Sequence, residues 1–150
     1  MKKIIKLFLR LAIGTTFLSA VADRFGWWDE KVSVWGNWNS FLEYTQVINP
    51  WFPDSLIPTL GIIATAAEII FGTFLLMGLK TEFIAKWSGF LLLLFALSMT
   101  FSIGLKATFD YSVFTASAGA FALSLMSEKS FELDCLISRR KKIKTHHNNV

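Results

Sequence analysis

The sequence predicts an all-α fold: a bundle of four transmembrane helices, with a short interfacial helix in the loop after the first of them. The 150 residues are 53% hydrophobic and only 17% charged, whereas about a quarter of the residues in a soluble domain are charged. The hydrophobic residues form long runs, and a helix that crosses a bilayer needs roughly 20 of them. Lysine and arginine gather at alternate ends of these runs, which is typical of multi-pass membrane proteins. We therefore expect a single integral membrane domain, 1–150.

Three of the predicted spans are defined by their lack of charge. Residues 87–105 and 111–127 carry no charged side chain, and residues 55–79 carry only Glu68. The run 111–127 is at the short end of what can cross a bilayer. With the first span, the prediction is about 4–25, 56–79, 84–105 and 110–128, with an outer loop 26–55 and a tail 129–150.

The first span also has features of a secretory signal, with a basic start, an apolar middle and "AVA" before Asp23. Arg10 interrupts the apolar stretch, however, and the segment is long enough to cross the membrane. Because three further spans follow, a retained first helix is the simpler interpretation, with cleavage as the alternative.

The distribution of charge predicts the orientation. Basic residues lie at the N-terminus, between the second and third spans, and in the tail segment "RRKKIK", 139–144. Acidic residues gather instead in residues 23–54. The positive-inside rule then places both termini in the cytoplasm. The basic tail is a topology anchor or a site for anionic lipid headgroups. The partners are membrane lipids and not nucleic acid, because no separate soluble basic domain exists.

The outer loop holds five of the six tryptophans, and tryptophan favours the membrane–water boundary. Within it, "NWNSFLEYTQVI" has the spacing of a short helix capped by Asn37 or Asn39, and Asn49-Pro50 ends it. We expect a helix lying on the outer leaflet or capping the bundle. A docking surface for a soluble partner is the alternative.

Glu68 is the only charge in its span and lies near the middle of it. Because its neighbours on the same face are small, it is expected to face another helix and not lipid. It is either ionised and paired, with Arg10 as the best intramembrane candidate, or neutral and bonded to a serine or threonine. Such a residue either holds helices together or contacts a ligand, a quinone or a proton. The candidate polar site is Glu68, Arg10, Thr65 and Ser19, and the small residues expected at helix contacts are Gly14, Gly61, Ala64, Gly72, Ala116, Gly119 and Ala120.

Four further charges lie at the outer ends of the first and fourth predicted spans: Asp23, Arg24, Lys106 and Asp110. They either bridge the ends of these two spans or are simply solvated.

Three segments resemble the DoxX family of membrane proteins. "RLAIGTTFLSAVADRFG", 10–26, looks like the first-helix signature of that family, and 66–100 looks like its second and third helices, including the glutamate, the following glycine and the "GLKT" turn. "GLKATFDYSVFTASAGAF", 104–121, is similar to the start of its fourth helix. The resemblance implies a four-helix inner-membrane protein associated with oxidoreductases, either quinone-linked or thiol-linked. The positions that match the family pattern are Arg10, Gly14, Asp23, Glu68 and Gly72, whose roles in the family are not established.

The sequence offers no catalytic residue. Cys135 is the only cysteine, so the chain has no C-x-x-C dithiol. The two histidines, His146 and His147, lie near the C-terminus, outside every span, which argues against haem ligation within the membrane and against a metal site. The chain has no G-x-G-x-x-G motif for a dinucleotide, and no histidine accompanies the serines and threonines of the predicted spans. No cofactor is evident, and a quinone is the one that remains as a candidate.

Three functions fit these observations. The first is a non-catalytic membrane subunit or partner of a redox system, which predicts a co-purifying enzyme or a bound quinone. The second is a binding or transport module for a small or lipophilic solute, although four short spans and fifteen phenylalanines suggest a small, tightly packed interior. The third is an assembly scaffold, in which Glu68→Gln is tolerated and Glu68→Leu destabilises the bundle. A homo-oligomer would enlarge a transport pathway. The family resemblance favours the first function.

Overall fold

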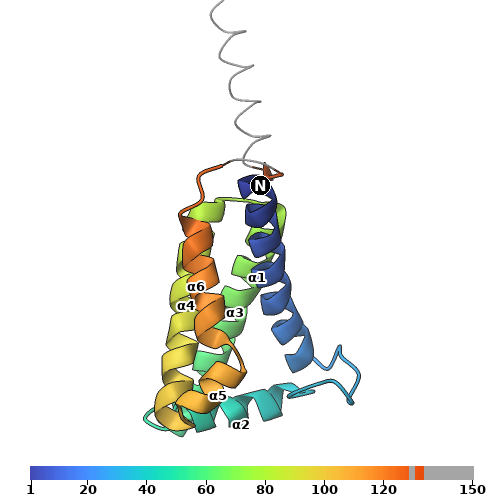
Figure 1. Ribbon diagram of the computed structural model, residues 1–150. Helices are drawn as coiled ribbons and strands as arrows, with labels where there is room; N and C mark the ends of the chain where they lie inside the picture. Colours follow the sequence, from blue (N-terminus) through green and yellow to red (C-terminus); the bar gives the residue numbers. More distant parts are fainter. Residues whose placement is uncertain (129–130, 134–150) are drawn as a thin grey trace, which may run out of the picture.

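The computed structural model describes residues 1–128 and 131–133, and this part of the chain is helical with no strand (Figure 1). The tail segment "RRKKIK", Cys135 and both histidines lie outside the described residues. The elements are α1 (Lys2–Arg24), α2 (Trp38–Ile48), the 3-10 turn η1 (Asp54–Leu56), α3 (Ile57–Met77), α4 (Thr81–Ser102), α5 (Leu105–Asp110) and α6 (Val113–Ser124).

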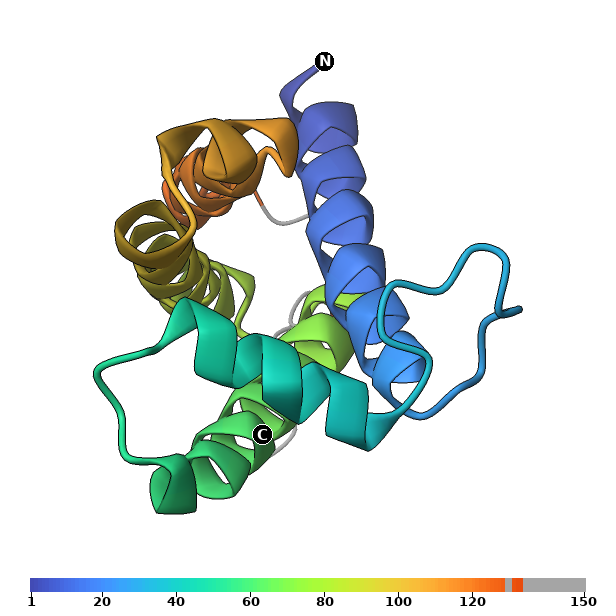
Figure 2. The ribbon, with the colours of Figure 1, turned by 90° about the horizontal axis from the view of Figure 1, so that it is seen from below.

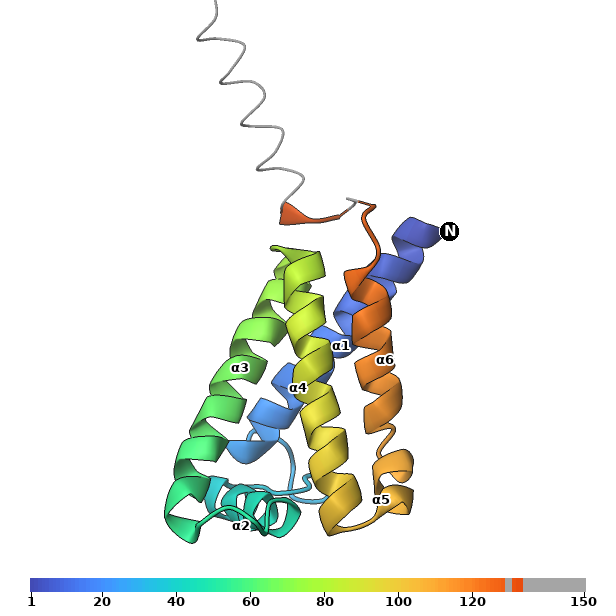
Figure 3. The same cartoon turned by 90° about the vertical axis from the view of Figure 1, so that its left-hand side faces the viewer.

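Four helices, α1, α3, α4 and α6, run along the bundle, and α2 lies across one end of it (Figures 1 and 2). The N-terminus, the turn between α3 and α4, and the end of α6 share the opposite end, as Figure 3 also shows. The predicted helical bundle is therefore confirmed at this level. The basic N-terminus lies at one end and the tryptophan-rich segment at the other.

In the described part of the chain, three helices are long and apolar enough to cross a membrane: 2–24, 54–77 and 81–102. Each agrees with a predicted span to within three residues at both ends. The boundaries follow the long hydrophobic runs, which end at a glycine or a polar turn. Gly78, for example, adopts a left-handed conformation with φ of 69° directly after α3, as glycine does at many helix ends.

The fourth predicted span, 110–128, is longer than the helix found there, α6 (Val113–Ser124). The chain forms the short α5, breaks at Tyr111 and Ser112, and continues as α6, which has only 12 residues. Ser112 has a left-handed backbone with φ of 54°, so the helix cannot run through it. At 1.5 Å per residue α6 is about 18 Å long, which is less than the ~30 Å of a hydrocarbon core. Composition alone did not reveal the break, because Tyr and Ser are both tolerated inside helices.

The predicted short helix in the outer loop is confirmed as α2. Asn37 is its cap, and the side-chain oxygen of Asn37 accepts a hydrogen bond from the backbone N–H of Ser40 at 3.0 Å. Phe41, Thr45 and Ile48 form its buried face. At its end, Asn49 accepts a hydrogen bond from Ser98 of α4 at 3.1 Å. These contacts fasten α2 across the end of the bundle.

Two helix contacts depend on small residues. A Cβ on Gly72 of α3 would lie 3.1 Å from the carbonyl oxygen of Gly14 of α1, so the two backbones approach closely there. In the other pair, Gly89 of α4 lies under the ring of Phe121, and the hydroxyl of Ser117 donates to the carbonyl of Gly89 at 2.9 Å.

Gly61 contacts α2 and not a long helix, and a Cβ on Gly119 would meet only Leu9, at 3.9 Å. Ala120 is completely buried, and Ala116 packs against the same core.

The crossing of α1 and α3 gives a stability prediction. Gly72→Ala is expected to lower the free energy of unfolding by about 1–3 kcal/mol, because the new methyl group would lie 3.0 Å from Leu18 and 3.1 Å from the backbone of Gly14. The matched control is Gly119→Ala, which has room for the methyl group and is expected to be neutral or stabilising by up to ~1 kcal/mol. Unfolding in detergent, followed by tryptophan fluorescence, measures both. Equal effects of the two variants would contradict the close crossing.

Candidate functional site

Glu68 forms a buried ion pair with Arg24. Nη1 of Arg24 lies 2.5 Å from Oε2 of Glu68, and the two side chains are only 3% and 4% exposed. The same Nη1 donates a hydrogen bond to the hydroxyl of Thr65 at 2.7 Å. Thr65 and Glu68 are three residues apart on α3, so both face α1. Of the two states considered for Glu68, the structure therefore shows the ion pair.

The partner expected from the sequence, Arg10, is the wrong one. Its Nε donates to the carbonyl of Leu75 at 2.9 Å, so Arg10 lies level with the end of α3. Leu75 is seven residues beyond Glu68, or about 10 Å along the helix. Arg24 begins at the other end of α1 and extends back into the bundle. Position along a helix gives only the depth of the backbone, and the long side chains of Arg10 and Arg24 extend to opposite halves of the bundle.

Aromatic rings enclose the guanidinium of Arg24 on its outer side. Its Cζ lies 4.0 Å from the ring centre of Phe41 and 5.3 Å from that of Trp35, which are distances typical of cation–π contacts. Phe41 comes from α2 and Trp35 from the loop before it. The tryptophan-rich segment thus closes the end of the bundle over the Arg24–Glu68 pair.

Asp23 holds this loop in place. Its carboxylate accepts hydrogen bonds from the hydroxyl of Ser33 and from the backbone N–H groups of Val34 and Trp35, at 3.0 and 2.9 Å for the two N–H groups. Asp23 is 6% exposed, so it neither bridges to the fourth predicted span nor lies in solvent. By fixing the backbone of Trp35, Asp23 helps to position the ring that lies beside Arg24.

Lys106 and Asp110 are the boundary charges that are solvated. They form an ion pair of 2.7 Å within α5, and their side chains are 88% and 60% exposed. Pairs of this kind contribute little to stability. They take no part in the site.

An open-sided cavity of about 1480 Å³ lies between α1, α3, α4 and α2, and its lining is mostly apolar. Ligand pockets in proteins usually measure about 300–1,000 Å³. The small, tightly packed interior expected from the short spans and the many phenylalanines is therefore wrong. Phe41, Thr45 and Ile48 of α2 line the cavity, so α2 forms its wall at that end of the bundle. The Arg24–Glu68 pair lines this cavity, as do Ser19 and Ala64 from the predicted set.

Ser19 lies on α1 and is exposed, and its backbone carbonyl accepts a hydrogen bond from Nε1 of Trp28 at 3.1 Å. The structure thus brings Glu68, Thr65 and Ser19 to one half of the bundle, and it places Arg10 in the other. Within the described residues, no group of three histidine, cysteine, aspartate or glutamate side chains could hold a metal ion.

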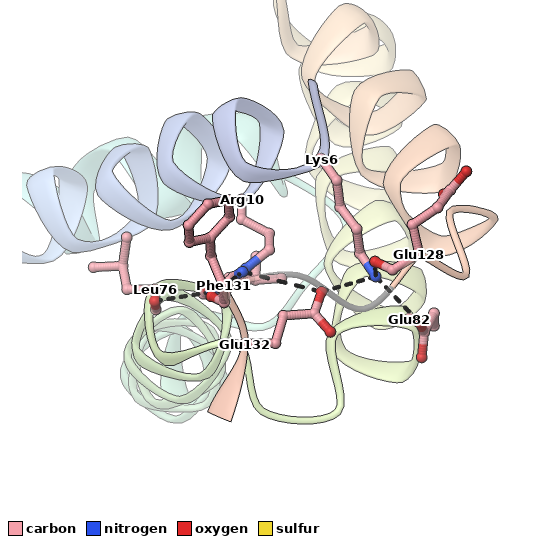
Figure 4. A network of polar contacts seen from close by, with 8 residues as sticks. Lys6, Arg10, Leu76, Glu82, Glu128, Phe131 and Glu132 are labelled. Atoms are coloured by element: carbon pink, nitrogen blue, oxygen red, sulfur yellow. Dashed lines mark hydrogen bonds and ion pairs between the residues drawn. The ribbon is translucent and has the colours of Figure 1, made fainter. Parts of the chain in front are cut away.

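A second buried charge cluster surrounds Arg10 at the opposite end of the bundle (Figure 4). Arg10 donates to the carbonyls of Leu75, Leu76 and Phe131, the last two at 3.1 and 2.8 Å. Lys6, one turn earlier on α1, is fully buried and pairs with Glu132 at 2.8 Å and Glu82 at 3.2 Å. Arg10 thus binds the last carbonyls of α3, where a cation is favourable. This arrangement joins three segments of the chain and is structural.

The burial of Arg24 could have been predicted from the sequence, although its pairing with Glu68 could not. The buried residues of α1 include Arg10, Phe17, Val21 and Arg24, which follow one another at intervals of seven, four and three residues. Residues at these intervals lie on the same face of an α-helix. Arg24 continues this face into the last turn of α1, so its side chain is expected to point into the bundle. The sequence gives no such signal for the contacts of Trp35 and Phe41 with Arg24, because these contacts depend on how the loop folds back over the bundle.

In the comparisons with known proteins, no family model matches the chain, and no curated protein or solved structure matches it either. The resemblance to the DoxX family therefore stays a prediction.

Proposed function

We propose that the chain is a multi-pass membrane protein that binds a lipophilic molecule in its cavity and performs no chemistry of its own. The observation that carries this proposal is the combination of a mostly apolar cavity of about 1480 Å³ with a single buried ion pair in its wall. Apolar walls suit a hydrocarbon chain, and a few polar groups fix the orientation of a ligand.

Outward-facing side chains support a place in the membrane. Ile62 of α3, Phe83 of α4 and Phe8 of α1 are each 58% to 68% exposed, although they lie on long helices and do not line the cavity. Exposed apolar side chains of this kind are expected to contact lipid. We place the chain in the bacterial inner membrane, with both termini in the cytoplasm and α2 at the outer surface. The basic residues of the N-terminus support this orientation.

A redox role is the more specific form of the proposal. The DoxX resemblance suggests that the bound lipophile is a quinone and that a redox enzyme is the partner. The Arg24–Glu68 pair supports a binding role, since charges buried within membrane helices are so often functional.

The test is to fill the cavity. Ala64→Phe is expected to abolish at least about nine-tenths of lipophile co-purification, because Ala64 lines the cavity and is only partly exposed. Ala66→Phe is the matched control, because Ala66 is exposed on the same helix and does not line the cavity. The measurement is gentle purification from native membranes, followed by mass spectrometry of the extracted lipids and quinones and of the co-purifying proteins.

A wild-type protein that carries no lipophile would contradict the proposal, and so would equal retention by the two variants. A bound lipophile with no redox enzyme would contradict only the redox partner.

A further inference from the structure

The charges in the cavity wall decide what kind of head group can enter. Asp23, Arg24 and Glu68 are the only charged residues among those that line the cavity in the described part of the chain. Arg24 and Glu68 neutralise each other. Asp23 retains its formal charge, although it is fully engaged with Ser33 and two backbone N–H groups.

An anionic head group therefore finds no available cation in this wall. It would lose its hydration on entering the cavity, it would lie near Asp23, and the guanidinium that could attract it already faces Glu68. A cationic head group would likewise find no available carboxylate, because Glu68 is paired with Arg24 and Asp23 is bonded to the loop. An uncharged head group avoids the cost of burying an unpaired charge.

The ion pair also has hydrogen-bonding capacity that the described residues do not use. Among the described residues, Oε2 of Glu68 has Arg24 as its one partner, and Nε of Arg24 and Nε1 of Trp35 donate no hydrogen bond. All three atoms are buried under neighbouring side chains. Partly satisfied polar groups of this kind are costly. A carbonyl or hydroxyl oxygen that reached the two N–H groups through a side-chain rotation would accept a hydrogen bond from them, and a hydroxyl would also donate to Oε2 of Glu68.

Building on the proposed function, we infer that the cavity selects an amphiphile with an uncharged, oxygen-bearing head group and rejects anionic lipids. The head group lies against Arg24, Glu68 and Trp35, and the hydrocarbon chain lies along the apolar walls. The recognition depends on the cancellation of charge between Arg24 and Glu68.

The experiment compares three probes that share a decyl chain: a decyl-substituted benzoquinone, decanoate and decyltrimethylammonium. The full chain is held in phosphatidylcholine nanodiscs at a pH where decanoate is ionised, and binding is measured by calorimetry against empty nanodiscs. The quinone is expected to bind at least tenfold more tightly than either ion. Glu68→Gln leaves Arg24 unpaired, so decanoate affinity is expected to rise at least tenfold. Arg24→Gln/Glu68→Gln is the matched control, since it removes both charges and keeps the preference for the uncharged probe.

If decanoate or the ammonium probe binds wild-type protein as tightly as the quinone does, the inferred selectivity is wrong while lipophile binding stands. If none of the three binds, both are wrong. A thermal melt of each variant shows whether it has folded. If Glu68→Gln does not fold, the order of affinities of the wild-type protein and the result for the double variant still test the selectivity.

Discussion

Arg24→Ala is expected to lower the free energy of unfolding by roughly 3–5 kcal/mol, because it leaves the carboxylate of Glu68 buried without a charge partner. The variant also loses the hydrogen bond to Thr65 and the contact with the Phe41 ring. The measurement is equilibrium unfolding in detergent, followed by tryptophan fluorescence. We expect the loss to be among the largest of any single substitution in the chain.

Two variants separate the charge from the rest of the side chain. Arg24→Met/Glu68→Leu replaces the pair with apolar residues of similar volume and is expected to recover most of the lost stability, as is often found for buried ion pairs. Lys106→Ala removes one member of an exposed pair and is expected to change the stability by less than about 1 kcal/mol. If Arg24→Ala were as mild as Lys106→Ala, the pair would not be buried as described.

Arg10→Ala is expected to have a comparable effect, roughly 3–5 kcal/mol, at the other end of the bundle. Arg10 is 1% exposed and donates to three backbone carbonyls, two of them at the end of α3. Hydrogen bonds from charged donors contribute about 1.5–3 kcal/mol each, and the carbonyls left behind would be partly buried. The substitution would also remove one of the two cations beside Glu132.

Arg10→Lys tests the geometry of these bonds. A single ammonium group cannot reproduce the planar fork of a guanidinium, so an intermediate loss is expected. Lys2→Ala is the matched control on the same helix, because Lys2 is 81% exposed and its contact with Glu128 is 3.5 Å long. The same unfolding titration measures all three variants. Full stability in Arg10→Ala would show that Arg10 is not needed to hold the end of α3.

The sequence by itself determined the three long helices and the capped α2, because these depend on local patterns. An uninterrupted apolar run fixes where a long helix lies, and Asn37 with Asn49-Pro50 fixes where α2 begins and ends. It also identified Glu68 as the unusual residue, since one charge in a long apolar run is visible without any structure.

Only the tertiary structure decided what Glu68 contacts and what surrounds it. Arg24 reaches Glu68 because α1 and α3 cross closely at Gly14 and Gly72, and because Asp23 anchors the loop that brings Trp35 over the guanidinium. The cavity depends on how far the helices separate, and the break before α6 depends on the backbone of Ser112. Contacts between residues far apart in the chain are set by the packing of whole helices, and no local pattern of residues encodes that packing.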